Sequence, residues 1–111
     1  MGTTGLETAF AALHTELVLT GELELETLVE RMTEGASLFG LPVPAVLPGQ
    51  AANLCLVDLE ERFEVGADGY ASRSANCCFH GRVLQGKVLL TLAAGAVAFR
   101  TRMLAAAAAI R

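Results

Sequence analysis

The segment "GRVLQGKVLLTLAAGAVAFR", residues 81–100, decides the fold class of the chain. It is rich in apolar residues, carries no charge between Lys87 and Arg100, and contains glycines at positions 86 and 95. Apolar runs of this length that are separated by glycine predict short β-strands rather than a long helix. Gly95 lies inside the apolar run and suits the tight turn of a β-hairpin. We therefore expect short strands interrupted at Gly86 and at Gly95.

The segments just before it extend this β-region. "ANLCLVDLE", residues 52–60, predicts a buried or half-buried strand, and residues 62–65 either extend it or pair with it. Residues 66–76 are rich in Gly, Ser and Asn and predict a loop. The proline-rich stretch 41–50 has no helical period, so we interpret it as a connector. Such a small sheet has open edges unless other strands pair with it.

The N-terminal part, residues 5–40, predicts two antiparallel helices. The first has apolar residues at helical spacing up to Thr20-Gly21, namely Leu6, Phe10, Leu13 and Leu17. Its start resembles a capping box, in which the Thr4 hydroxyl and the Glu7 carboxylate each bind a free N–H of the first turn. The second helix has one apolar and one acidic face and should end at Gly40. The acidic face consists of Glu24, Glu26, Glu30 and Glu34 and is expected to be solvated.

The composition restricts the class of protein. The 111 residues suffice for one small domain, yet 53% are apolar and the mean hydropathy is +0.50. A membrane span needs about 20 apolar residues, and Arg100 and Arg102 interrupt the only long apolar region. The N-terminus lacks a basic region and contains Glu7, so no secretory signal is predicted. We expect a cytoplasmic chain, not bound to membranes, whose apolar faces contact a partner or a second copy.

Charge is distributed unevenly along the chain. Residues 1–34 carry a net charge of −6, residues 35–71 of −4 and residues 72–111 of +6, which gives the overall −4. The basic part has no aromatic interleaving and no basic motif, so nucleic-acid binding is not expected. Electrostatic compensation between the two ends of the chain is the favoured explanation.

Soft metal ligands cluster only at Cys77-Cys78-Phe79-His80. A metal site, a disulfide and a nucleophile are all conceivable for such a cluster. Two adjacent cysteines are poorly placed to chelate one tetrahedral zinc, which prefers the spacing C-x₂₋₄-C. A disulfide between neighbours would strain the backbone. A Cys/His metal or redox module therefore stays a third interpretation, and we do not expect these residues to carry the chemistry.

Four stretches of the sequence, in order, resemble the C-terminal quarter of dihydroorotases of the amidohydrolase superfamily. The family's helix start G-x-x-G-x-E-T matches Gly2, Gly5, Glu7 and Thr8, and its N-P-A-x-x-F-G-L matches Ala36, Phe39, Gly40 and Leu41. Its strand A-D-L-V-L-V-D matches residues 52–58, with Asn53 in place of the aspartate. Its S-x-S-x-N-T-P-F-x-G-x-x-L-x-G matches Ser72, Ser74, Asn76, Phe79, Gly81, Leu84 and Gly86. Cys77 and Cys78 occupy the threonine and proline positions.

The resemblance implies a fold class and a domain organisation. It implies an α+β fragment, in which two helices from the end of a (β/α)₈ barrel precede strands of a composite β-sandwich and a short C-terminal helix. Residues 1–41 would be the last barrel helices, residues 42–101 the sandwich strands, and residues 102–111 the terminal helix. The strands that the small sheet lacks would then come from an N-terminal part.

The resemblance also implies a reaction. Dihydroorotases are zinc enzymes of de novo pyrimidine biosynthesis that reversibly hydrolyse dihydroorotate to carbamoyl-aspartate. Gly2 matches a glycine that offers its backbone to the substrate. The chain has only His14, His80 and Lys87 as histidines and lysine, without the H-x-H of the metal site. We therefore expect no catalytic or metal-ligating residue and no bound cofactor in this chain, and no activity of the chain alone.

Two kinds of partner follow from this interpretation. The first is the missing N-terminal part of the barrel, or another subunit that supplies it. The alternative is a non-catalytic role as a dihydroorotase-like structural partner, for example of aspartate transcarbamoylase. The remaining candidates are not expected to be catalytic: His14 on the first helix should be structural or face solvent, His80 should lie on the surface, Asp58 should cap the turn after its strand, and Glu7 should cap the helix.

Overall fold

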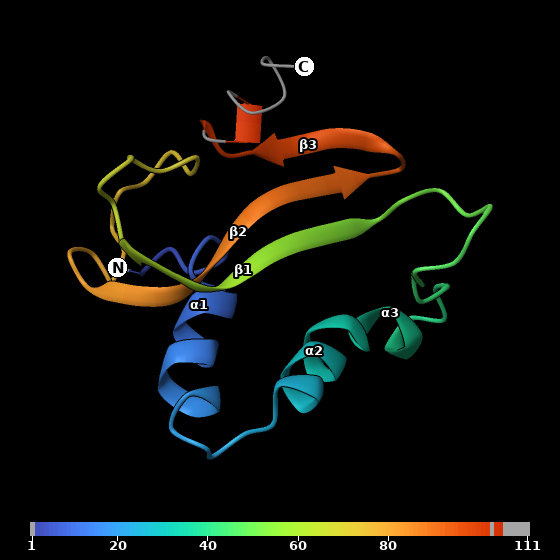
Figure 1. Ribbon diagram of the computed structural model, residues 1–111, viewed down its shortest axis with the longest axis horizontal. Coiled ribbons are helices and arrows are strands. Elements are labelled where there is room, and N and C mark those ends of the chain that lie inside the picture. The colour runs from blue at the N-terminus through green and yellow to red at the C-terminus, as the bar shows by residue number, and fades with distance from the viewer. Residues whose placement is uncertain (1, 103, 106–111) are drawn as a thin grey trace. The chain divides into compact units, whose positions relative to one another are not determined.

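The computed structural model describes residues 2–102 and 104–105 (Figure 1). By its contacts the chain divides into two compact units, Met1–Arg31 with Leu59–Lys87, and Met32–Asp58 with Val88–Arg111. We refer to them as the first and the second unit. Two helical regions and a three-stranded sheet give an α+β fragment, as predicted. The barrel origin of the helices and the three family-based segments stay predictions.

The sheet contains β1 (Leu54–Glu64), β2 (Val83–Ala93) and β3 (Ala96–Arg100) in the order β1-β2-β3. β2 and β3 pair antiparallel, with a register shift between Thr91 and Leu92. Ala94 and Gly95 connect them with φ angles of 50° and 82°, the two positive values of a type I′ turn. The predicted hairpin at Gly95 is therefore confirmed, and so is the extension of the first strand beyond residue 60.

The expectation that Gly86 interrupts a strand is wrong. β2 runs through this position, and Gly86 has a φ of 101°, which other residues rarely adopt. The glycine is needed because a Cβ there would lie 3.1 Å from His14 Nδ1 and 3.2 Å from Phe10 Cε1. Gly86 thus lets the strand pass close to the first helix rather than ending it.

The helical part is shorter than the spacing predicts. α1 (Ala9–Leu13) continues into the π-helical turn η1 (His14–Val18), and α2 (Leu25–Thr33) is followed by the short α3 (Gly35–Leu38). Gly21 and Gly40 follow these regions with positive φ, as the predicted ends require. Of the predicted terminal helix, residues 102 and 104–105 are helical. Residues 103 and 106–111 lie outside the described residues.

The predicted capping box at the start of the first helix is wrong. α1 begins only at Ala9, and its N-cap residue Thr8 makes no side-chain cap hydrogen bond. The Thr4 hydroxyl instead donates to the carbonyl of Asn76, and the Glu7 carboxylate binds residues 71 and 72. Several donors in one loop offer the carboxylate more hydrogen bonds than a single helix N–H does.

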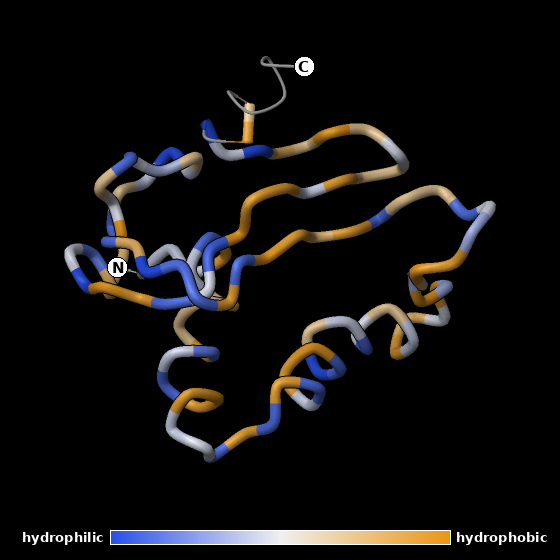
Figure 2. Tube along the Cα trace, viewed as in Figure 1, coloured by the Kyte–Doolittle hydropathy of each residue, from blue (hydrophilic) through white to orange (hydrophobic). Residues whose placement is uncertain are grey.

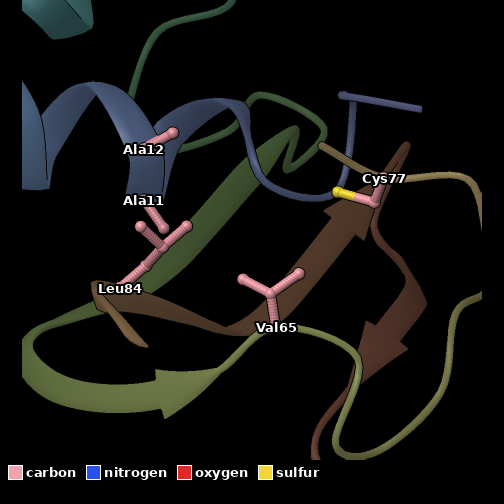
Figure 3. Close-up of a cluster of buried hydrophobic side chains, with 5 residues drawn as sticks. All are labelled: Ala11, Ala12, Val65, Cys77 and Leu84. Atoms are coloured by element: carbon pink, nitrogen blue, oxygen red, sulfur yellow. The ribbon is translucent and has the colours of Figure 1, made fainter. Parts of the chain in front are cut away.

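The hydrophobic core of the first unit is small. It consists of Ala11, Ala12, Val65, Cys77 and Leu84, against which Phe63, Tyr70 and Phe79 pack. Leu84 has no exposed surface and reaches from β2 toward Ala11 of α1 (Figure 3). The small residues Ala11 and Ala12 on α1 let the helix lie close to the strand that carries Leu84.

The second unit has no buried residue in the part that the structure describes. Its helix end, proline-rich connector and hairpin expose large apolar side chains, with Phe39 at 83% the most exposed of them. Figure 2 shows the hydrophobic character of the β2–β3 hairpin. An apolar surface of this kind is typical of a contact face. No helix within the described residues is long and apolar enough to span a bilayer.

Candidate functional site

The N-terminal segment is bound to the loop that precedes β2. Eight residues make these contacts, and we call them the N-terminal clamp: Gly2, Thr3, Thr4, Glu7, Ala71, Ser72, Asn76 and Cys78. Contacting partners lie up to 75 positions apart in the sequence, yet all belong to the first unit. The clamp brings together the G-x-x-G-x-E-T and the S-x-S-x-N stretches singled out in the sequence.

Asn76 is the centre of the clamp. Its backbone carbonyl accepts from the N–H of Thr4 at 2.8 Å and from the hydroxyl of Thr3 at 3.2 Å. Its side-chain amide donates to the carbonyl of Gly2. The Thr3 hydroxyl also accepts from the N–H of Cys78 at 2.8 Å. Gly2, the predicted substrate contact, is exposed, and the hydrogen bond from Asn76 to its carbonyl fixes its position.

Glu7 forms the second anchor of the clamp. Its carboxylate accepts from the Ser72 hydroxyl at 2.6 Å and from the N–H groups of Ala71 and Ser72 at 3.0 and 2.9 Å. The Ser72 hydroxyl, followed by these two N–H groups, lowers the pKa of Glu7 because all three stabilise the ionised form. Glu7 thus caps a loop turn and not a helix, which corrects its predicted role.

The lowered pKa of Glu7 makes a pH dependence testable. Since the pKa is lower in the folded than in the unfolded chain, the carboxylate stabilises the fold above the unfolded value of about 4.3. This contribution disappears as the pH falls through the folded value. Glu7→Gln should cost about 1 kcal/mol of unfolding free energy at neutral pH and flatten the decline in acid. Urea unfolding at a series of pH values measures both.

Glu22→Gln is the matched control for this substitution. It removes an exposed carboxylate from the turn after η1, and within the described residues this side chain holds no loop. The control should retain the neutral-pH stability and the acid decline of the original chain. Equal acid profiles for Glu7→Gln and the original chain would contradict the role of the carboxylate.

Of the two roles predicted for His14, structural or solvent-facing, its burial supports the structural one. Only 3% of it is exposed, and its ring stacks on Phe10 at 5.7 Å between centroids. Its Nδ1 lies 3.1 Å from the carbonyl of Gln85, so Nδ1 carries the proton, since a carbonyl only accepts. Thr15 exchanges two more hydrogen bonds with the backbone of Gln85. These contacts join the π-helical turn to β2.

His80 lies on the surface, as predicted, but it has a partner. Its Nδ1 is 2.8 Å from the Tyr70 hydroxyl. Partial burial, and next the neighbouring thiol of Cys77, raise the pKa of the Tyr70 hydroxyl. Cys77 belongs to the core, while Cys78 is exposed, and both are free thiols, as is Cys55. The two adjacent cysteines therefore lie in different environments, Cys77 in the core and Cys78 on the surface.

Two polar residues from the sequence analysis lie on β1 and just before it. Asp58 lies within β1, which continues to Glu64, so its predicted role as a cap after the strand is wrong. Asn53 replaces the aspartate of the resemblance, and its Oδ1 accepts from the N–H of Ala94 at 3.0 Å. The amide oxygen thus supplies a hydrogen-bond acceptor for the hairpin turn in the second unit.

Within the described residues, ion pairs connect the acidic and the basic parts of the sequence. Arg82 binds Glu16, and Lys87 Nζ lies 3.0 Å from the Glu61 carboxylate. Both pairs join a base from residues 72–111 to an acid from residues 1–71. They agree with the expected electrostatic compensation.

The residues that the structure describes do not fit a zinc site. Among the described residues, no three His, Cys, Asp or Glu side chains lie together in a way that could hold a metal. His14 and His80 each use Nδ1 in a hydrogen bond within the fold, and Cys77 is in the core. The prediction that metal ligands lie outside this chain stays a prediction.

Comparison with known proteins identifies the origin of these motifs. No family model matches the chain. Dihydroorotase from Lactiplantibacillus plantarum is 42% identical over 100 residues, and those from Bacillus subtilis and Lactobacillus leichmannii are 37% and 33% identical over 99 and 102 residues. The chain is homologous to dihydroorotases. The matches cover 88–91% of this chain, and the chain spans 23–24% of the length of these dihydroorotases. The resemblance to a dihydroorotase segment is thereby confirmed.

The clamp is the part of the site that sequence reasoning missed. The signal was present, because Gly2 and Glu7 of one dihydroorotase motif and Ser72 and Asn76 of another are its members. Thr3 and Thr4 occupy variable positions of the first motif, although both bind Asn76. Motif matching identifies the two partners separately but does not say that they contact each other.

Proposed function

We propose that the chain is the C-terminal part of a dihydroorotase-like zinc amidohydrolase. The whole enzyme would hydrolyse dihydroorotate reversibly to carbamoyl-aspartate in de novo pyrimidine biosynthesis. The observation that carries the proposal is the clamp, in which two dihydroorotase motifs from distant parts of the chain bind each other. A chance similarity of short motifs gives no reason for such contacts.

In this proposal the chain supplies a substrate contact and not the chemistry of bond cleavage. Hydrolysis of a cyclic amide needs an activated water and a base, and the described residues offer no cluster for a metal. Gly2, held at the end of the clamp, would offer its backbone to dihydroorotate. The remaining catalytic groups would come from a part of the enzyme outside this sequence.

The exposed apolar surface of the second unit supports a partner for this chain. Large side chains such as Leu38, Phe39 and Val46 are 80% exposed or more. Burying each of them against a partner would contribute about 1.5–3 kcal/mol. In the leading proposal the rest of the barrel enzyme covers this surface. In the alternative, another subunit such as aspartate transcarbamoylase covers it and the role is non-catalytic.

A chimeric enzyme tests the leading proposal. In it, this chain replaces the matching segment of the Lactiplantibacillus plantarum dihydroorotase, with which it is 42% identical. With zinc present, the chimera should hydrolyse dihydroorotate with kcat/KM within about 100-fold of the parent, since misplacement by about 1 Å costs about that factor. The chain alone should show no turnover.

The controls separate the two roles. The parent enzyme without the matching segment should be inactive. A folded chimera that is also inactive, together with co-elution of the chain and aspartate transcarbamoylase in gel filtration, would contradict the leading proposal in favour of the alternative. Metal-dependent turnover by the chain alone would contradict the expectation that it carries no complete site.

A further inference from the structure

One residue of the clamp controls the orientation of two consecutive peptide groups. The side-chain amide of Asn76 donates to the carbonyl of Gly2, and its backbone carbonyl accepts from the N–H of Thr4 at 2.8 Å. All peptide bonds in the described chain are trans, so the carbonyl and the N–H of each peptide point in opposite directions. A peptide whose carbonyl is held in this way cannot rotate without losing its hydrogen bond.

We infer that Asn76 is a positioning residue for the backbone of Gly2. The inference rests on the proposed function, in which Gly2 contacts the substrate. Asn76 itself does not touch the substrate and acts through the peptide group between Gly2 and Thr3. An asparagine is required because the Gly2 carbonyl needs a donor, which an aspartate of the same shape lacks.

Other hydrogen bonds of the clamp restrain the backbone on both sides of Asn76. The N–H of Asn76 donates to the Ser74 hydroxyl at 3.1 Å, which fixes the loop on one side. The Cys78 N–H binds the Thr3 hydroxyl on the other side. Glu7 holds residues 71 and 72 through three hydrogen bonds. A backbone group that is ordered beforehand binds a ligand without an additional entropy cost.

Kinetics of the chimera described above test this role. Asn76→Ala should raise the KM for dihydroorotate about tenfold and leave kcat within about twofold. The substitution removes the hydrogen bond that orients the Gly2 peptide group, and this peptide group would bind the substrate equally well in the ground state and in the transition state. Asn76→Asp should raise KM at least as much, since its carboxylate repels the Gly2 carbonyl. A purely structural role would lower the melting temperature without changing KM.

Asn53→Ala is the matched control, since it removes the same side chain from the hairpin turn of the second unit. It should leave KM unchanged. In the chain alone, amide hydrogen exchange at Thr4 should be faster in Asn76→Ala than in Asn53→Ala.

The outcomes separate the two proposals. An active chimera whose KM does not change in Asn76→Ala overturns the positioning role alone. If the chimera without any substitution is inactive, the proposed function is overturned, and the positioning role with it.

Discussion

Leu84→Ala is expected to destabilise the first unit by about 3 kcal/mol, the middle of the range for buried leucines. Leu84 is fully buried between β2 and α1, and its neighbours Ala11 and Ala12 are too small to fill the space it would leave. A cavity would therefore remain, which adds to the loss of apolar burial. Urea unfolding of the purified chain, followed by far-UV circular dichroism, measures the change.

Leu41→Ala is the control for this substitution. Leu41 is 60% exposed in the connector, so the same truncation should change stability by less than about 0.5 kcal/mol. If both substitutions shifted the unfolding midpoint equally, the core would not be where the structure has it. The comparison needs no assumption about a partner.

Gly86→Ala is expected to cost at least about 2 kcal/mol. Its positive φ alone costs an L-residue about 1–2 kcal/mol. The new Cβ would also lie 3.1 Å from His14 Nδ1 and 3.2 Å from Phe10 Cε1, both buried or half-buried on the helix, so these rings must shift. Thermal unfolding together with the urea midpoint measures the loss.

Gly95→Ala separates the backbone strain from the contact with the rings. Gly95 has a similar positive φ of 82°, but a Cβ added there would meet no atom of the described residues within 4 Å, apart from its chain neighbours. This variant should lose only the strain energy. A loss for Gly95→Ala as large as that for Gly86→Ala would show that His14 and Phe10 tolerate a side chain at position 86.

The sequence predicts the element types of this chain better than their ends. The hairpin at Gly95 and the strand at residues 54–64 follow from local apolar runs and turn residues, which act over short distances. The start of α1 could not be predicted in this way. Thr4 and Glu7 have the right spacing for a capping box, but their partners lie more than 60 residues away.

The same reason applies to Gly86 and to the site. A glycine in an apolar run indicates a break unless one knows that a helix passes next to it, as α1 does with Phe10 and η1 with His14. Likewise, Asn76 is recognisable as a motif residue, but its contact with Gly2 is a tertiary one. Local propensity contains no term for such contacts, so tertiary packing decided these positions.

The clamp has a consequence for how the chain folds during synthesis. Its N-terminal half leaves the ribosome first, but Thr3 cannot bind the Cys78 N–H until 75 further residues have been made. At about 5–20 residues per second this takes at least several seconds. Closing so long a loop costs chain entropy before any of its hydrogen bonds form. Gly2 therefore reaches its final orientation only after residues 76–78 have been made, whereas α1 can form earlier from local contacts.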